Sequence, residues 1–165
     1  MPRPLEPPTH AKLTEKAASY LRRNHAIVIT EISGGMETPD AIGFQGGGVT
    51  TLIECKVSRG DYLSGLQKFF RKRQESGMGN YRYYLTPKGM IALAELPPGW
   101  GLLELWGSRV HVIMRPTFKS ERNAQGERAI LISLIRRIGQ DSPKGVSIKF
   151  YTFQTKNTAT AGVKK

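Results

Sequence analysis

The chain has a single cysteine, Cys55, among its 165 residues, so no disulfide can form within it. A lone thiol fits a reducing compartment, and we expect a cytoplasmic protein. No apolar run approaches the roughly 20 residues that a membrane-spanning helix requires, so we expect no membrane partner. Residues 1–8 are proline-rich without an apolar core, which is unlike a signal peptide and predicts a disordered lead-in.

Acidic residues are scarce in comparison with basic ones. There are 13 Asp and Glu residues against 25 Lys and Arg residues, which gives a formal net charge of +12 and a pI near 10.1. Such an excess predicts a polyanionic partner, because lysine and arginine neutralise phosphates and release counterions. Basicity that serves only solubility or assembly is the alternative. The three histidines, His10, His25 and His111, are too far apart for zinc-ligand spacing.

Length and pattern together predict one domain. A chain of this length with 39% hydrophobic residues can bury a core, and we place a single domain at residues 9–153, followed by a disordered basic tail at 154–165. The expected helices lie at 9–23, 58–73, 88–96 and the second half of 120–137. The expected strands lie at 26–32, 40–44, 49–53, 81–85, 101–106, 109–114 and 146–153. This order predicts an α/β fold with a central mixed β-sheet flanked by helices.

Two of these strands form a predicted hairpin in which two carboxylates lie opposite each other. Residues 40–44 and 49–53 are joined by a glycine loop, Gly46–Gly48, in which a glycine can take positive φ. If Gln45 pairs with Val49, the register places Asp40 directly opposite Glu54. Opposed carboxylates repel each other in a sheet, and a hard divalent cation is the usual relief.

A lysine lies beside this pair of carboxylates. Residues two apart in a strand share a face, so Glu54 and Lys56 project together while Cys55 points to the other face. Without Asp40, an exposed Glu54–Lys56 ion pair would be the simplest interpretation. With Asp40 across the hairpin, the sequence predicts an oxygen-ligand metal site with a lysine next to it.

The order Pro39-Asp40, a hairpin, and then Glu54-Cys55-Lys56 resembles the PD-(D/E)XK nuclease superfamily. The stretch from Gly60 to Gln67 is similar to the segment that follows the Glu-x-Lys motif in its VRR-type branch. The resemblance covers about half of the chain, from residue 9 to residue 85. It implies a restriction-endonuclease-like fold and a magnesium-dependent nuclease, with manganese as a substitute ion.

The resemblance also implies roles for individual residues. Asp40 and Glu54 would hold the metal ion together with the backbone carbonyl of Cys55, and Lys56 would orient or deprotonate the attacking water. Glu15 would be the outer ligand that the family carries on its first helix. Gln67 would face the site or the scissile phosphate from the helix after the motif. Many members act as dimers, so a homodimer is left open.

A basic cluster follows the motif on the same predicted helix. We expect Lys68, Arg71, Lys72 and Arg73 to contact phosphates, because their helix begins directly after the strand that carries Glu54. Together with this cluster, the resemblance implies a nuclease that cuts DNA, as an endonuclease. The first alternative is a non-catalytic nucleic-acid-binding module derived from such a fold. The second is a small basic RNA-binding protein in which the acidic pair is accidental.

Overall fold

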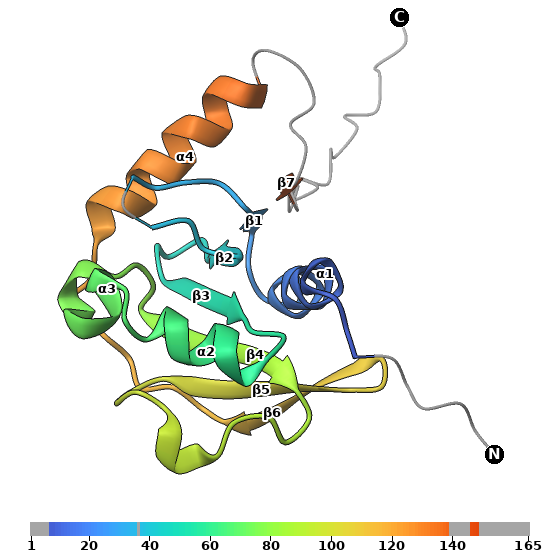
Figure 1. The fold of residues 1–165 in the computed structure, drawn as a ribbon. Coiled ribbons are helices and arrows are strands. Elements are labelled where there is room, and N and C mark those ends of the chain that lie inside the picture. The colour runs from blue at the N-terminus through green and yellow to red at the C-terminus, as the bar shows by residue number, and fades with distance from the viewer. Residues whose placement is uncertain (1–6, 36, 139–145, 149–165) are drawn as a thin grey trace, which may run out of the picture.

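The computed structural model describes residues 7–35, 37–138 and 146–148. It confirms the α/β fold, with a central mixed sheet and helices on both sides of it (Figure 1). The strands run in the spatial order β6-β5-β4-β3-β2-β1-β7. The predicted lead-in before residue 7 and the tail at 154–165 lie outside the described residues.

The sheet is parallel at its centre and antiparallel toward its edges. β3 pairs parallel with β4 and β4 with β5, while every other neighbouring pair is antiparallel. The strands are β1 (Ile27–Thr30), β2 (Ala41–Phe44), β3 (Thr50–Cys55), β4 (Tyr81–Pro87), β5 (Gly101–Trp106), β6 (Arg109–Met114) and β7 (Val146–Ile148). The carboxyl ends of β3, β4 and β5 therefore meet at one edge of the sheet.

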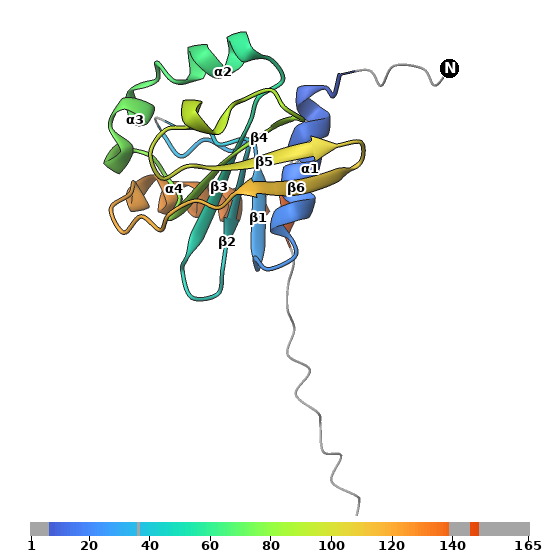
Figure 2. The same cartoon turned by 90° about the horizontal axis from the view of Figure 1, so that it is seen from below.

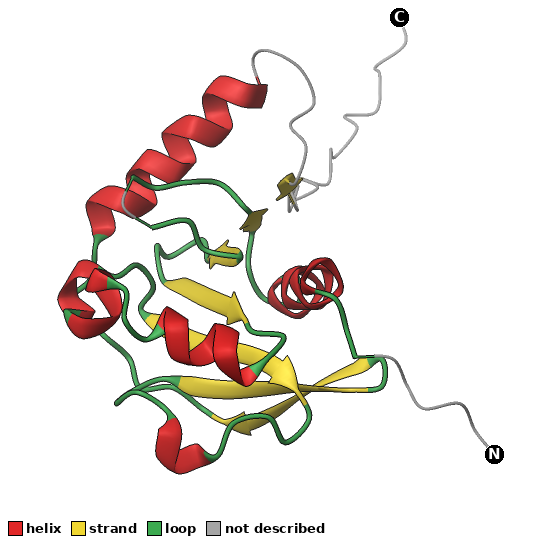
Figure 3. Cartoon of the chain, viewed as in Figure 1, coloured by secondary structure: helices red, strands yellow, loops and turns green. Residues whose placement is uncertain are grey.

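Among the described residues, α1 (His10–Leu21) is the helix that covers one face of the sheet (Figure 3). Thr9 caps its first turn, and its apolar side buries Leu13, Ala17 and Leu21 against the sheet. Each fully buried leucine contributes roughly 1.5–3 kcal/mol of transfer free energy. On the sheet side, Ile53 and Cys55 of β3 face this helix, as strand alternation requires.

The opposite face carries α2 (Arg59–Gly65), α3 (Phe69–Lys72) and α4 (Ala124–Ile138), which Figure 2 shows from a second direction. Leu52 and Tyr84 of the sheet pack there against Tyr62 of α2 and Ile130 of α4. Because Glu54 follows Leu52 by two residues, its side chain projects onto this face and not onto the face that α1 covers.

Helix α4 begins at Ala124, earlier than the second half of 120–137 that was expected, and three further segments differ from the sequence prediction. The helix expected over 58–73 is divided into α2 and α3, with a break at 66–68. The helix expected over 88–96 is a turn followed by a 3-10 helix, Leu93–Glu95. The first strand is shorter than expected and stops before Glu31, whose φ of 57° is incompatible with a continuing strand.

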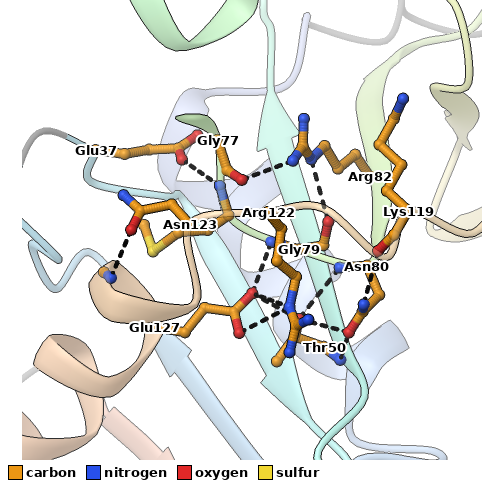
Figure 4. A network of polar contacts seen from close by, with 12 residues as sticks. Glu37, Thr50, Gly77, Gly79, Asn80, Arg82, Lys119, Arg122, Asn123 and Glu127 are labelled. Carbon is orange, nitrogen blue, oxygen red and sulfur yellow. Dashed lines mark hydrogen bonds and ion pairs between the residues drawn. The ribbon is translucent and has the colours of Figure 1, made fainter. Parts of the chain in front are cut away.

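The start of α4 is fastened to the sheet by a buried polar network (Figure 4). The Glu127 carboxylate accepts hydrogen bonds from the Thr50 hydroxyl at 2.8 Å, from the Gly79 N–H at 2.9 Å and from Arg122 at 3.0 Å. The side-chain oxygen of Asn80 accepts from the Thr50 N–H at 3.0 Å. Such satisfied networks fix the relative position of the elements that they join. Among the described residues, no helix is long and apolar enough to cross a bilayer.

Candidate active site

The predicted hairpin register is present in the structure. Ala41 pairs with Ile53 and Phe44 with Thr50, and the Gln45 N–H donates to the Val49 carbonyl at 2.8 Å. Gly48 closes the loop with a φ of 83°, a value that favours glycine. Continuing this register by one residue places Asp40 opposite Glu54.

The Asp40 carboxylate is held by a neighbouring strand and by α1. Its Oδ2 accepts a hydrogen bond from the Cys55 N–H at 2.7 Å, and its Oδ1 lies 3.2 Å from Nε2 of His10. His10 is the first residue of α1, so this contact ties the start of the helix to the end of the hairpin. With 18% of its side chain exposed, Asp40 is the more accessible of the two opposed carboxylates.

Glu54 is almost fully buried and lies between two cations. Its Oε1 is 2.8 Å from a guanidinium nitrogen of Arg71, and its Oε2 is 4.0 Å from Nζ of Lys56. Burial raises the pKa of the Glu54 carboxyl above its usual value, Arg71 opposes this rise, and the charges of Asp40 and Glu37 add to it. Burial is thus the main influence that favours the neutral form of Glu54, and the nearby carboxylates add to it.

Arg71 is in turn held by a second buried carboxylate. Its other terminal nitrogen donates to Oε1 of Glu37 at 2.8 Å, and Oε2 of Glu37 accepts from the Met78 N–H at 2.8 Å. The side chains of Arg71 and Glu37 are 2% and 1% exposed. Arg71 therefore holds the Glu54 carboxylate in position, and Glu37 holds the Arg71 guanidinium.

Lys56 is packed beneath α2. Its Nζ lies 3.4 Å from Oδ1 of Asp61, whose other oxygen accepts from the Val57 N–H at 3.4 Å. A Cβ on Gly65 would come within 3.1 Å of the Lys56 ammonium, so glycine at this position allows the helix to approach the lysine closely. The ammonium is thereby held between Asp61 and Glu54, on the sheet face where the sequence placed it.

The chemistry of these groups fits a divalent cation. The ion pairs and hydrogen bonds described above involve the four carboxylates of Glu37, Asp40, Glu54 and Asp61 and only two permanent cations, those of Lys56 and Arg71. A positive ion between Asp40 and Glu54 would relieve their repulsion. In the described part of the chain, no three His, Cys, Asp or Glu side chains form a metal-holding group. Magnesium suits such a site, since it is often bound by one or two carboxylates and keeps several waters.

Two residues expected at this site lie elsewhere. The Glu15 side chain is 61% exposed and pairs with Lys12 at 3.0 Å. It is five residues beyond His10, which is about 140° around the helix, so the structure does not bring it to the two carboxylates. Gln67 is exposed in the break between α2 and α3, because the continuous helix expected there does not form. Neither side chain contacts Asp40 or Glu54.

Cys55 and one residue of the basic cluster, Arg71, are buried, and the rest of the cluster is exposed. The Cys55 thiol is buried on the α1 face, where burial raises its pKa, so only its backbone carbonyl remains a candidate ligand. Lys68, Lys72 and Arg73 are exposed, as expected for phosphate contacts. The prediction for Arg71 is wrong, because its guanidinium is buried between Glu37 and Glu54 and does not face solvent.

Sequence reasoning missed the parts that His10, Glu37 and Asp61 take in the site. Glu37 and Arg71 are 34 residues apart, and no periodic pattern links them, because their contact depends on how α3 turns back toward the sheet. Asp61 had a usable signal, since it lies in the first turn of a helix that starts just after Lys56. His10 had no such signal in the sequence, because a single histidine at the start of a helix does not indicate which residue it contacts.

Comparison with known proteins supports the fold and leaves the activity open. The sequence matches no protein-family model and no curated protein. A solved structure of a protein of unknown function from Silicibacter pomeroyi is similar to this chain, with a TM-score of 0.62 and 19% sequence identity. The similarity covers 81% of this chain and 91% of the other. At this level of identity, it shows a shared fold alone.

Proposed function

We propose that the protein is a magnesium-dependent nuclease that hydrolyses DNA phosphodiester bonds, as an endonuclease with a restriction-endonuclease-like fold. The observation that carries the proposal is the arrangement of three side chains at the ends of β2 and β3. Asp40 lies opposite Glu54 in the hairpin register, and Lys56 projects beside Glu54. Phosphodiester hydrolysis needs a positioned water, neutralised phosphate charge and a protonated leaving oxygen, and these groups supply much of that chemistry.

Asp40 and Glu54 are the residues that would hold the metal ion. When bound, the ion would supply a Lewis acid that polarises the phosphate and lowers the pKa of a water molecule. Asp40 is fixed for this role by the Cys55 N–H, and Glu54 by Arg71. Manganese, which accepts similar oxygen ligands, is expected to substitute for magnesium.

The remaining groups act on the water and the phosphate. The Lys56 ammonium is held beside Glu54 and Asp61, where it can orient the attacking water and stabilise the charge of the pentacovalent transition state. Its near-complete burial restricts its movement, which favours preorganised electrostatic stabilisation. The net charge of +12 and the exposed Lys68, Lys72 and Arg73 supply long-range attraction for the polyanion.

A non-catalytic nucleic-acid-binding module is the rival function, and one observation favours it. Both oxygens of Glu54 already face protein cations, with Arg71 at 2.8 Å and Lys56 at 4.0 Å. A carboxylate neutralised in this way can be purely structural. This rival function predicts the same affinity for DNA but no cleavage of DNA, with or without divalent ions.

Plasmid cleavage separates the two functions. Supercoiled plasmid is incubated with the purified chain in magnesium, in manganese and in chelator, beside Lys56→Ala and the exposed control Arg128→Ala. The proposal predicts nicked or linear products only with metal, retained by Arg128→Ala and lost by Lys56→Ala. Absence of cleavage with either ion would favour the rival function. Cleavage that persists in chelator, or equal activity in all three proteins, would also refute the proposal and indicate a contaminating enzyme. Parallel incubation with single-stranded RNA tests the choice of DNA.

A further inference from the structure

A groove lies at the same end of the sheet as the candidate active site, lined by residues of the start of α1, the end of β4 and the β5–β6 hairpin. Figures 1 and 2 show how these elements are arranged. Its volume is about 580 Å³, and it is lined by prolines, by two lysines and by the indole of Trp106. Pro8 and Lys12 form the wall on the α1 side, and Pro87 and Lys88 the wall at the end of β4. The lining is thus largely apolar, with a lysine on each side.

Trp106 is an exposed aromatic ring in a fixed orientation. Its side chain is 40% exposed, whereas the other tryptophan, Trp100, is 1% exposed. Its indole N–H donates to Oε2 of Glu104 at 2.8 Å, and one face stacks on the His111 ring at 4.3 Å. Glu104 is itself held by the Gly89 N–H at 2.8 Å. A large aromatic that is both exposed and rigid is a ready stacking surface.

A lysine covers the indole in the unbound chain. Nζ of Lys88 lies 4.4 Å from the centroid of the Trp106 ring. An exposed cation–π contact of this kind is weak, so a phosphate can draw the ammonium away and leave the ring to a base. Lys12 provides a second charge, and its exposed ion pair with Glu15 is also easily exchanged.

The groove opens at the same edge of the sheet as the two carboxylates. Cys55 pairs with Leu85 and Leu85 with Leu103 in the parallel register, and β4 and β5 continue past this level to Pro87 and Trp106. With strands about 4.8 Å apart, β5 lies roughly 10 Å from β3. The first turn of α1 serves both places, since His10 contacts Asp40 and Lys12 lines the groove.

We infer that this groove binds an unpaired nucleotide, with the base on the indole of Trp106 and its phosphates at Lys88 and Lys12. The choice of a nucleic acid as the ligand rests on the proposed function. The base must be unpaired because bases within a duplex are stacked on both faces and expose only their edges in the grooves. The substrate class that this site favours is therefore a DNA strand with unpaired bases near the bond that is cut.

Binding in chelator tests the groove without any catalysis. Tryptophan emission and the anisotropy of a labelled oligonucleotide are recorded with single-stranded oligothymidylate and with a blunt-ended duplex. Oligothymidylate is expected to quench the emission, and the duplex is expected to quench it far less. Trp106→Leu should weaken binding of the single strand roughly 10-fold or more, as loss of a stacking aromatic does. Trp106→Phe should restore most of the affinity but lose the quenching, because only the buried Trp100 remains.

Matched variants separate stacking from general charge and from misfolding. Phe118→Leu removes an aromatic that is 54% exposed elsewhere on the surface and should leave the affinity unchanged. Lys88→Gln should weaken binding of the single strand and reduce its salt slope by about one phosphate contact, roughly 0.7. Circular dichroism and thermal melts verify that each variant is folded.

Two results would overturn the inference: equal affinity of Trp106→Leu and the parent for oligothymidylate, or equal quenching by the blunt duplex. Failure of the proposed nuclease activity has a different signature. If the chain binds the single strand through Trp106 but never cleaves DNA, the inference about the groove stands and the proposed nuclease function fails. If Trp106→Leu cleaves plasmid normally and has unchanged affinity for the single strand, the nuclease function stands and the inference about the groove fails.

Discussion

The ionised form of Glu54 is stabilised by some of its neighbours and destabilised by others. Arg71 and Lys56 attract its carboxylate, while burial and the charges of Asp40 and Glu37 favour its neutral form. Removing one partner from a buried pair of this kind leaves an uncompensated charge, which usually costs about 3–5 kcal/mol. Each substitution in this cluster therefore changes stability as well as chemistry, and activity assays need a stability measurement beside them.

His25 gives the chain a pH dependence of stability that is separate from the candidate site. Its Nδ1 lies 2.9 Å from the Leu21 carbonyl and its Nε2 lies 2.9 Å from the Thr51 hydroxyl. Burial lowers the pKa of His25 in the folded chain, and the bond to Leu21 opposes that effect only in part. The unfolded chain, with a histidine pKa near 6.5, therefore binds the proton more readily.

We predict that the contribution of His25 to stability is complete above about pH 6.5 and is lost as the pH falls through its lower folded-state pKa. Urea denaturation of the parent and of His25→Asn, at pH 7.5 and at pH 5.5, measures it. The parent should lose more free energy of unfolding over this interval than the variant does. An equal loss in both proteins would assign the pH dependence to other groups.

Single residues in the hairpin were predictable because their positions follow from local rules. The glycine loop and strand alternation were sufficient to place Asp40, Glu54 and Lys56, and the structure agrees on their register and face. The positions of Glu15 and Arg71 were not predictable in this way. They depend on helix rotation and on the break at 66–68, which long-range contacts with Glu37 and Glu54 help to set.

At the scale of elements, α4 is attached to the sheet along one side and exposed along the other. Glu127 in its first turn accepts hydrogen bonds from Thr50, Gly79 and Arg122, and Ile130 and Leu134 pack on the core. On its other side, Ile132 and Ile135 are 58% and 68% exposed. The docking of the helix therefore depends on the buried carboxylate together with Ile130 and Leu134, because the side of the helix that carries Ile132 and Ile135 buries little apolar surface.

Glu127→Ala is predicted to loosen α4 more than the rest of the chain. Loss of the carboxylate leaves the Thr50 hydroxyl and the Gly79 N–H without this partner, at a cost of about 1–3 kcal/mol for each buried group. Hydrogen exchange should accelerate across α4 and at the start of β3, with less change in β5. The neighbouring exposed substitution Arg128→Ala serves as the control and should alter exchange little. Uniform acceleration over all elements would mean that α4 does not open independently.

The element order was readable from the sequence, and the element ends were less so. Alternation and helical periodicity gave the sheet strands, α1 and α4, because each has one apolar face against a large core. The segment after Lys88 lacked such a face and formed a 3-10 helix held by the ion pair of Glu95 with Arg59. A contact between residues 36 positions apart has no local signature.

At the scale of the whole molecule, the positive charge predicts nucleic-acid binding that depends strongly on salt. Replacing the exposed Lys68, Lys72 and Arg73 with glutamine should weaken binding to duplex DNA of any sequence. It should also reduce the slope of log affinity against log salt by up to about 2.7, or 0.9 for each lost phosphate contact. Arg71 is left intact, because its burial between Glu37 and Glu54 makes it part of the folded core.

Three arginines on α4 provide a charge-matched comparison. Arg128, Arg136 and Arg137 are exposed, and their replacement removes the same charge from a different surface. If the charge near the candidate site guides DNA, this triple variant should keep a steeper slope than the variant of Lys68, Lys72 and Arg73. Equal slopes would indicate that net charge alone, and no particular surface, determines binding.

The claim that Asp40 and Glu54 share one divalent cation is tested most directly by thermal melts of the parent, Asp40→Asn and the exposed control Glu121→Gln, in chelator and in magnesium. In chelator, Asp40→Asn should melt close to the parent, because it keeps an oxygen for the Cys55 N–H and loses repulsion with Glu54. Magnesium at 100 times its dissociation constant stabilises a folded binding site by about 2.7 kcal/mol. For a chain of this size, that corresponds to a rise of roughly 5–10 °C. The parent and Glu121→Gln should show this rise and Asp40→Asn should show little of it, whereas the same response in all three proteins, or none in the parent, would contradict a shared site.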